Sequence, residues 1–401
     1  MPTNRWLSLY AKLCVFVLLG LILLGALVTT YDAGMAVPTW PTINGQMNPP
    51  GWTNEMLTRL EHSHRLTAMS VGVLVGVLCA WIWGNIWALG VAVGVSSLAG
   101  GAARYLKLDG NLAMQLTIWP AAVVFVLFLL YTHRRAGGKV TSLHRLALVV
   151  FFCVCIQAVM GGYRVTLETA GNDAVKAAQV ELALAKSDPA DAAKHTAAAD
   201  QLGAKAEQLY PLATNLRIVH GIFAQFTLLL LVILAARLSP IAAELAAASE
   251  LAGAPKIHRM AKAAIGLYFL QLACGAYLRH RNLGMLIPTW PGGWPEVWTF
   301  PVMVHFLHSR VLPFLLFGHI LGMAIGTAKR ARGQGRLVRP GFGLLALVVI
   351  QIAFGALIIF KGGRYTGPHA VNSHVVNGAL ILATAGLLAT RARLLSPRAT
   401  A

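Results

Sequence analysis

Ten apolar runs, each long enough to cross a lipid bilayer, constrain this chain more than any other feature of its sequence. A membrane-spanning helix needs about 20 apolar residues. The sequence is 57% hydrophobic and only 12% charged, which is far from the composition of a soluble globule. We therefore expect an all-α polytopic membrane protein with about ten transmembrane helices. The expected spans are residues 12–30, 65–83, 86–104, 112–131, 143–163, 216–236, 260–278, 302–326, 341–360 and 374–390.

The net charge of +19 is concentrated at the ends of these runs. Basic residues fall on one side of the expected membrane, which is the positive-inside pattern with both termini in the cytoplasm. Acidic residues gather in the long loops of the opposite side. The charge thus predicts a multi-pass protein of the cell membrane and no nucleic-acid partner. The basic residues are Arg134, Arg135, Lys139, Arg145, Lys256, Arg259, Lys329, Arg330, Arg332, Arg336, Arg339, Arg391, Arg393 and Arg398.

Sequence motifs recur in the same order in the two halves of the chain. A Gly-Met pair followed by Pro-Thr-Trp-Pro occurs at residues 34–41 and again at 284–291. QAVMGGYRV with LRIVHGIFA downstream is matched by QIAFGALII with NSHVVNGAL downstream. Such an order predicts a duplicated bundle whose halves run in the same direction across the membrane. The expected parts are an N-terminal half at 1–237, a cytoplasmic linker at 238–259 and a C-terminal half at 260–401.

Each repeated unit carries one histidine near the outer end of its second helix: His64, His220, His308 and His374. An ionisable residue inside a membrane span indicates function by default, although a single such histidine can also serve as a hydrogen-bond partner between helices. Two histidines from neighbouring helices can hold a haem iron from both sides. No cysteine-rich or carboxylate-rich cluster accompanies them, which argues against zinc, di-iron or iron–sulfur centres. Four histidines in register predict two haem sites, one in each half.

A carboxylate accompanies only one of these histidines. Glu61 precedes His64 by three residues and shares its helix face, whereas His305 stands at the matching place before His308. Chemistry on a haem substituent can use a proton acceptor or a charge stabiliser, which pure electron transfer does not need. The asymmetry favours the N-terminal half as the reaction site. A carboxylate stabilised by the helix macrodipole is the alternative interpretation of Glu61.

EHSHR (61–65), FLHSR (306–310), the Pro-Thr-Trp-Pro loops and the two downstream histidine segments together resemble the haem A synthase family, the cytochrome c oxidase assembly proteins. The resemblance implies an eight-helix core of two four-helix bundles. It implies that His64, His220 and Glu61 surround the substrate haem O, and that His308 and His374 bind haem b. The implied reaction oxidises a ring methyl of haem O to a formyl group, giving haem A. Arg65 and Arg310 are expected to pair with haem propionates.

Partners are only partly implied by the resemblance. Haem O synthase is the expected supplier of substrate, and the lipid bilayer is the surrounding medium. The electron acceptor, the source of oxygen and a homo-oligomeric state stay open.

Two segments depart from the family pattern. Residues 86–131 add a pair of helices between the His64 helix and the QAVMGG helix. The outer loop 168–214 is rich in alanine and in charges of both signs, so it predicts one or two short amphipathic helices interrupted around Asp188-Pro189. The role of both segments is open at this level.

Two other functions fit part of the pattern. Four histidines alone would suit a di-haem b-type cytochrome in quinone-linked electron transfer, and parallel repeats would suit a haem carrier. The carboxylate at Glu61 speaks against the cytochrome. The absence of paired broken helices at the bilayer midplane speaks against the carrier.

Overall fold

The computed structural model describes residues 4–40, 43, 46, 48–108, 110–364 and 367–397, and helices dominate this part of the chain. Pro41 of the first Pro-Thr-Trp-Pro motif and Arg398 of the basic tail lie outside the described residues. The elements in chain order are α1 (Arg5–Thr30), η1 (Ala33–Met35), α2 (Met56–Trp83), α3 (Trp87–Tyr105), α4 (Gly110–Arg135), α5 (Ser142–Ser187), α6 (Ala192–Arg237), α7 (Pro240–Ala247), α8 (Ala254–His280), α9 (Phe300–Phe306), η2 (Leu307–Val311), α10 (Leu312–Arg330), α11 (Gly335–Phe360) and α12 (Pro368–Leu394).

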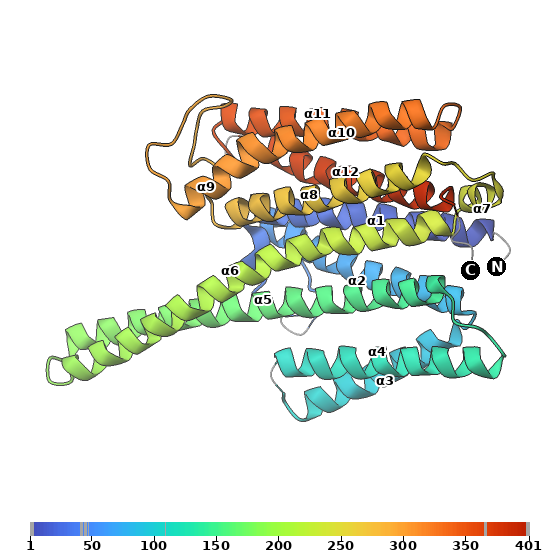
Figure 1. The fold of residues 1–401 in the computed structure, drawn as a ribbon. Helices are drawn as coiled ribbons and strands as arrows, with labels where there is room; N and C mark the ends of the chain where they lie inside the picture. Colours follow the sequence, from blue (N-terminus) through green and yellow to red (C-terminus); the bar gives the residue numbers. More distant parts are fainter. Residues whose placement is uncertain are drawn as a thin grey trace.

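The chain is a multi-pass membrane protein. Across the described residues, nine helical segments are long and apolar enough to span a bilayer, and α9, η2 and α10 together make one of them. The predicted number of ten is therefore too high by this measure. The predicted third span does form α3, but glycines and Ser96-Ser97 dilute its apolar character. Because α3 and α4 still run as a hairpin, both ends of the described chain lie at the same end of the molecule (Figure 1).

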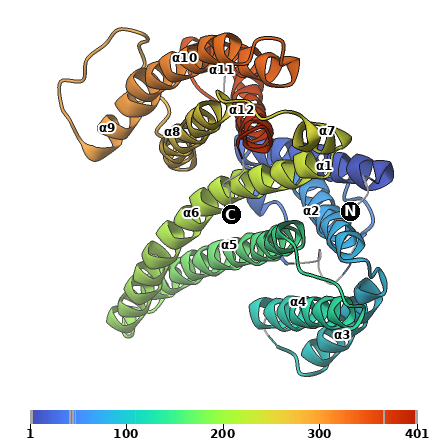
Figure 2. The ribbon, with the colours of Figure 1, turned by 45° about the vertical axis from the view of Figure 1, so that its right-hand side comes forward.

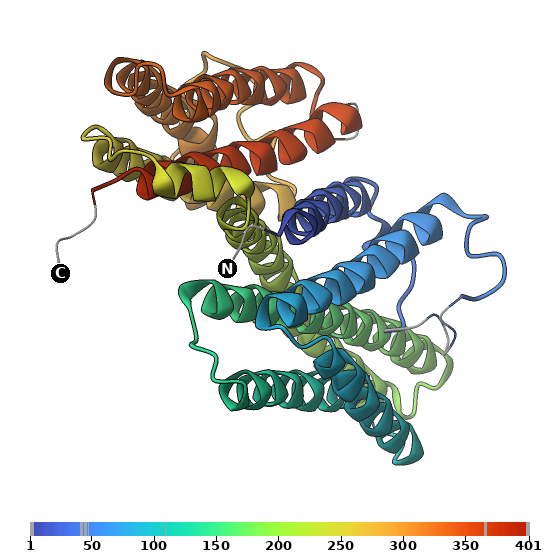
Figure 3. The same ribbon diagram turned by 90° about the vertical axis from the view of Figure 1, so that its right-hand side faces the viewer.

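The long helices pack in two groups (Figure 3). The N-terminal group contains α1, α2, α5 and α6, and the C-terminal group contains α8, α10, α11 and α12. Each group has its own buried apolar cluster. The groups meet where α12 packs on α1 and α6 and where α8 packs on α6. At this seam Leu229 of α6 lies so close to Gly386 of α12 that an added Cβ would be 2.5 Å from the Leu229 Cδ1 atom.

The helices α5 and α6 extend far beyond the other helices (Figures 1 and 2). Each has 46 residues and is therefore roughly 70 Å long, about twice the 30 Å thickness of a bilayer core. Short separate helices were expected in the loop 168–214, but these residues continue the membrane helices instead. The alanine-rich sequence offers no helix stop before the predicted interruption, where α5 ends with Asp188 as its C-cap. Small residues such as Ala174 and Ala206 let the two helices pack closely.

The inserted pair α3–α4 packs outside the N-terminal group, against α2 and α5 (Figure 3). Its contact with α5 includes Phe125 and Phe151, whose ring centroids are 4.7 Å apart. Phe125 and Leu129 have no solvent exposure. The predicted insertion at 86–131 is thus a helical hairpin anchored to the bundle by large buried side chains.

Candidate functional site

Each of the four predicted histidines packs against a glycine of another helix in its own group. The contact depends on the missing side chain, because a Cβ at Gly275 would lie 2.6 Å from the His308 Cε1 atom and one at Gly25 would lie 3.1 Å from the His64 Cε1 atom. At the other two glycines the distance would be 3.6 Å and 3.5 Å. The pairs are His64–Gly25, His220–Gly161, His308–Gly275 and His374–Gly355.

The two histidines of the C-terminal pair lie close together with the edge of one ring toward the face of the other. The ring centroids of His308 and His374 are 6.3 Å apart, with planes inclined at 69°. Bonds from a metal to imidazole nitrogen are about 2 Å long, so this spacing suits an iron held between the two rings. The His308 Nδ1 atom lies 3.1 Å from the Gln271 carbonyl oxygen, and the Gln271 amide donates in return to the His308 carbonyl. These contacts orient the ring and leave its Nε2 atom for a ligand.

The N-terminal pair comes from α2, which carries His64, and α6, which carries His220. Gln157 of α5 donates to the His220 carbonyl at 3.2 Å, the same kind of contact that Gln271 makes with His308. Among the described residues, the Nδ1 atoms of His64, His220 and His374 are buried without a hydrogen-bond partner. Buried imidazoles that lack a close polar partner are uncommon, and neutral imidazole nitrogen is a ligand that suits a haem iron.

Beside His64, Glu61 and Arg65 form a buried ion pair. The Arg65 Nε atom donates to Glu61 Oε1 at 2.8 Å, and the two side chains are only 3% and 5% exposed. The other guanidinium nitrogens donate to the carbonyls of Thr39 at 2.5 Å and Val37 at 2.7 Å. The Arg65 guanidinium also lies over the Trp40 ring, 5.2 Å from its centroid. Arg65 therefore ties the loop that contains Val37 and Thr39 to the carboxylate of Glu61.

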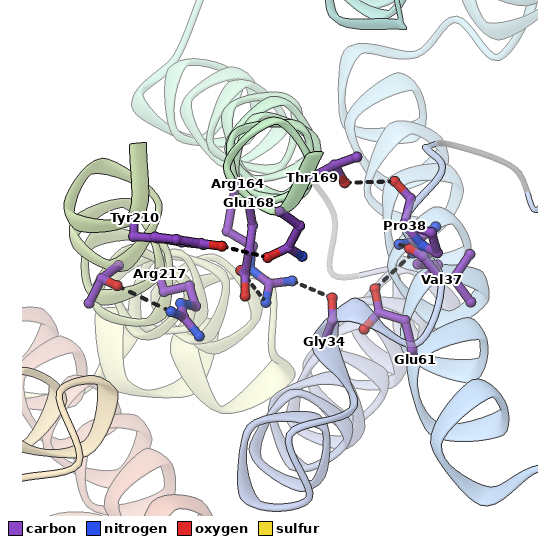
Figure 4. Close-up of polar contacts among 12 residues, drawn as sticks. Gly34, Val37, Pro38, Glu61, Arg164, Glu168, Thr169, Tyr210 and Arg217 are labelled. Atoms are coloured by element: carbon purple, nitrogen blue, oxygen red, sulfur yellow. Dashed lines mark hydrogen bonds and ion pairs between the residues drawn. The ribbon is translucent and has the colours of Figure 1, made fainter. Parts of the chain in front are cut away.

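A second arginine holds the same loop from α5 (Figure 4). Arg164 donates to the Gly34 carbonyl at 2.6 Å and pairs with Glu168 at 3.0 Å. Thr169, which follows Arg164 by five residues on α5, donates to the Pro38 carbonyl. Residues 31–40 are thus fixed from two sides, by α2 and by α5.

Arg310 holds the second Pro-Thr-Trp-Pro loop in a similar way. Its Nη2 atom donates to the carbonyls of Gly292 and Thr289, the first at 2.6 Å. Arg310 follows His305 by five residues, whereas Arg65 follows Glu61 by four. The π-helical segment η2 (Leu307–Val311) accommodates this extra residue, because each of its hydrogen bonds spans five residues. The insertion thereby brings Arg310 to the loop carbonyls.

Three further histidines, His305, His195 and His133, make other contacts. His305, at the place matching Glu61, is 3% exposed and bonds the Gly284 carbonyl through Nε2 at 3.0 Å. His195 pairs with Glu181 in the projecting part of the α5–α6 hairpin. His133 packs against Trp83 and His144 in the α2–α4–α5 contact.

The hydrogen bonds that Gln157 and Gln271 donate to histidine carbonyls, and the contact of Trp40 with Arg65, are not among the predicted features of the site. The sequence does contain a pattern that indicates the glutamines. A glutamine stands four residues before three of the four glycines that face a histidine, in QAVMG, QLACG and QIAFG, and a leucine stands at that place in LILLG.

Gly275→Ala is expected to reduce bound haem sharply, because its Cβ would displace the His308 ring. Gly266→Ala on the same helix is the matched control, since nothing lies within 4 Å of an added Cβ there, and helix propensity alone should make it neutral or stabilising by about 0.5–1 kcal/mol. Haem absorbance per mole of purified protein measures both. Equal haem content in the two variants would show that the glycine contact does not position His308.

Residues 211–386 match the family model COX15-CtaA, described as cytochrome oxidase assembly protein. The matched region includes His220, His308 and His374. Over these residues, which make up a little under half of the chain, the sequence is similar to the COX15-CtaA family. Glu61 and His64 lie outside the matched residues.

Curated relatives align with only part of this chain. A protein named "Heme A synthase" from Lysinibacillus sphaericus is 34% identical over 31% of this chain and 35% of its own length. One of the same name from Geobacillus kaustophilus is 32% identical over 29% of this chain and 35% of its own. One from Bacillus cereus is 41% identical over 20% of this chain and 24% of its own. Each alignment thus spans about a third or less of the relative.

Proposed function

We propose that this protein is a haem A synthase, an oxidoreductase that converts a ring methyl of haem O into a formyl group for cytochrome c oxidase assembly. The observation that carries the proposal is the buried Glu61–Arg65 pair next to His64, for which the C-terminal group offers only His305 at the matching place. Two histidine pairs of similar construction therefore differ in one ionisable group. That difference is expected if one pair serves a reaction and the other serves electron transfer.

In the N-terminal group, His64 and His220 would bind and orient the substrate haem O. Glu61 would serve as the proton-accepting group beside His64, with its carboxylate held in place by Arg65. The loop at 31–40, fixed by Arg65 and Arg164, would keep bulk water from the reacting carbon.

In the C-terminal group, His308 and His374 would hold haem b. When bound, this haem supplies one-electron transfer. Gln271 would set the orientation and tautomer of the His308 ring through the contact at Nδ1. Arg310 would hold the second outer loop over this site, with the remaining donors available to a propionate.

We also propose that the halves 1–237 and 260–401 arose by duplication, joined by the linker 238–259 that contains α7. Both termini would lie in the cytoplasm, so the α5–α6 hairpin would project outside the cell membrane. Haem O synthase would supply the substrate.

The experiment is expression in cells that make haem O but no haem A, followed by haem extraction and chromatography. Haem A is expected with this chain and not with the empty vector. Haem b alone would overturn the synthase in favour of a di-haem cytochrome in quinone-linked electron transfer. Unmodified haem O with no haem b would favour a haem carrier.

A further inference from the structure

The inserted hairpin α3–α4 reaches the outer loop of the N-terminal site. Met114, near the start of α4, is 6% exposed, and its sulfur lies 2.8 Å from the Trp40 indole nitrogen. Trp40 belongs to the loop that Arg65 and Arg164 hold. The hairpin therefore contacts the loop directly as well as packing on α5 through Phe125.

Trp40 connects this contact to the buried ion pair. Its ring lies under the Arg65 guanidinium, and the carbonyl of the preceding residue, Thr39, accepts a hydrogen bond from the same guanidinium. Arg65 in turn holds Glu61 at 2.8 Å. A displacement of the Trp40 ring would thus remove the aromatic contact of the Arg65 guanidinium. It would also move the Thr39 carbonyl, which accepts a hydrogen bond from that guanidinium.

The space at this junction is filled tightly. A Cβ at Gly162 of α5 would lie 2.5 Å from the Trp40 Nε1 atom and 2.6 Å from the Met114 sulfur. Three parts of the chain, namely the outer loop, α4 and α5, therefore meet at one point without room for another carbon atom. Close packing of this kind transmits small displacements.

We propose that the α3–α4 hairpin supports the reaction site, with Met114 and Trp40 as positioning residues for the Glu61–Arg65 pair. The hairpin holds the Trp40 ring against Arg65, and Arg65 holds the carboxylate. The structural part of this proposal stands on the contacts alone, whereas its effect on catalysis rests on the proposed synthase function.

The test compares Met114→Ala with Leu116→Ala in the purified full-length chain. Leu116 is the matched control, because it lies two residues further along α4 and its side chain is 41% exposed. The first readout is amide hydrogen exchange of peptides covering 31–40 and 58–66. Exchange should be severalfold faster in Met114→Ala and unchanged in Leu116→Ala, since opening of a segment follows loss of its packing. Gly162→Ala disturbs the same junction from α5 and should give the same pattern.

The second readout is haem A formation. Met114→Ala should lower the turnover rate by roughly ten- to a hundredfold, as expected for a displaced catalytic group, with little change in haem O binding. Met114→Leu, which keeps the bulk against the Trp40 ring, should restore most of it. No further loss should follow when Met114→Ala is combined with Glu61→Gln.

Unchanged exchange in both Met114→Ala and Gly162→Ala would overturn the proposal, whatever the activity. Faster exchange with a turnover rate equal to that of wild type would overturn the positioning role. Faster exchange in a chain whose wild type makes no haem A would overturn the synthase function and leave the supporting contact established.

Discussion

Glu61→Gln is expected to lower haem A formation by about 10²–10⁴-fold, the range that a general acid or base contributes. Glutamine keeps an oxygen that can accept from the Arg65 Nε atom, so the loop contacts of Arg65 to Val37 and Thr39 should persist. What the substitution removes is the ability to take up a proton. Haem b content should stay at the wild-type level, because His308 and His374 belong to the other group.

The measurement is the ratio of haem A to haem O in extracts of cells expressing each variant at equal protein level. Glu244→Gln is the control, because Glu244 also pairs with an arginine, Arg336, but is 61% exposed in a pair outside both histidine sites. It should behave as wild type. A Glu61→Gln protein that makes haem A at the normal rate would show that the carboxylate has only the structural role that a helix terminus favours.

The positions of the helices are largely predictable from the sequence. Apolar runs of sufficient length located all the major membrane helices and the inserted pair, because the bilayer requires such runs. The glycines and serines of α3 lower its hydropathy, so α3 is less apolar than the nine segments that can span a bilayer among the described residues. The continuous 46-residue helices were missed because an alanine-rich, charged segment was interpreted as a loop element, although nothing in it stops a helix before Asp188.

The candidate site is predictable in part. Register along a helix places Glu61 and Arg65 one turn apart, so their pairing could have been expected. Their joint contact with the first loop depends on the backbone path of residues 31–40, which no local pattern specifies. The π-helical segment at His308 could have been inferred from the extra residue between His305 and Arg310, but only by comparing the two halves.

The two histidine pairs are expected to hold different haems, and their removal should have separate effects. His308→Ala with His374→Ala should remove haem b, with a loss at least as large as the roughly 10–100-fold fall in affinity seen when outer-shell partners are changed. His64→Ala with His220→Ala should remove haem O and haem A and leave haem b. The physical reason is that each pair is built within its own helix group, with its own glycine contacts and its own apolar core.

The most direct test of this assignment is the haem composition of the two purified double variants, determined by extraction and chromatography, with Gly266→Ala as the control for handling. We expect haem O without haem b in the His308/His374 variant, and haem b without haem O or haem A in the His64/His220 variant. Loss of haem b from the His64/His220 variant, with haem O retained, would contradict the assignment.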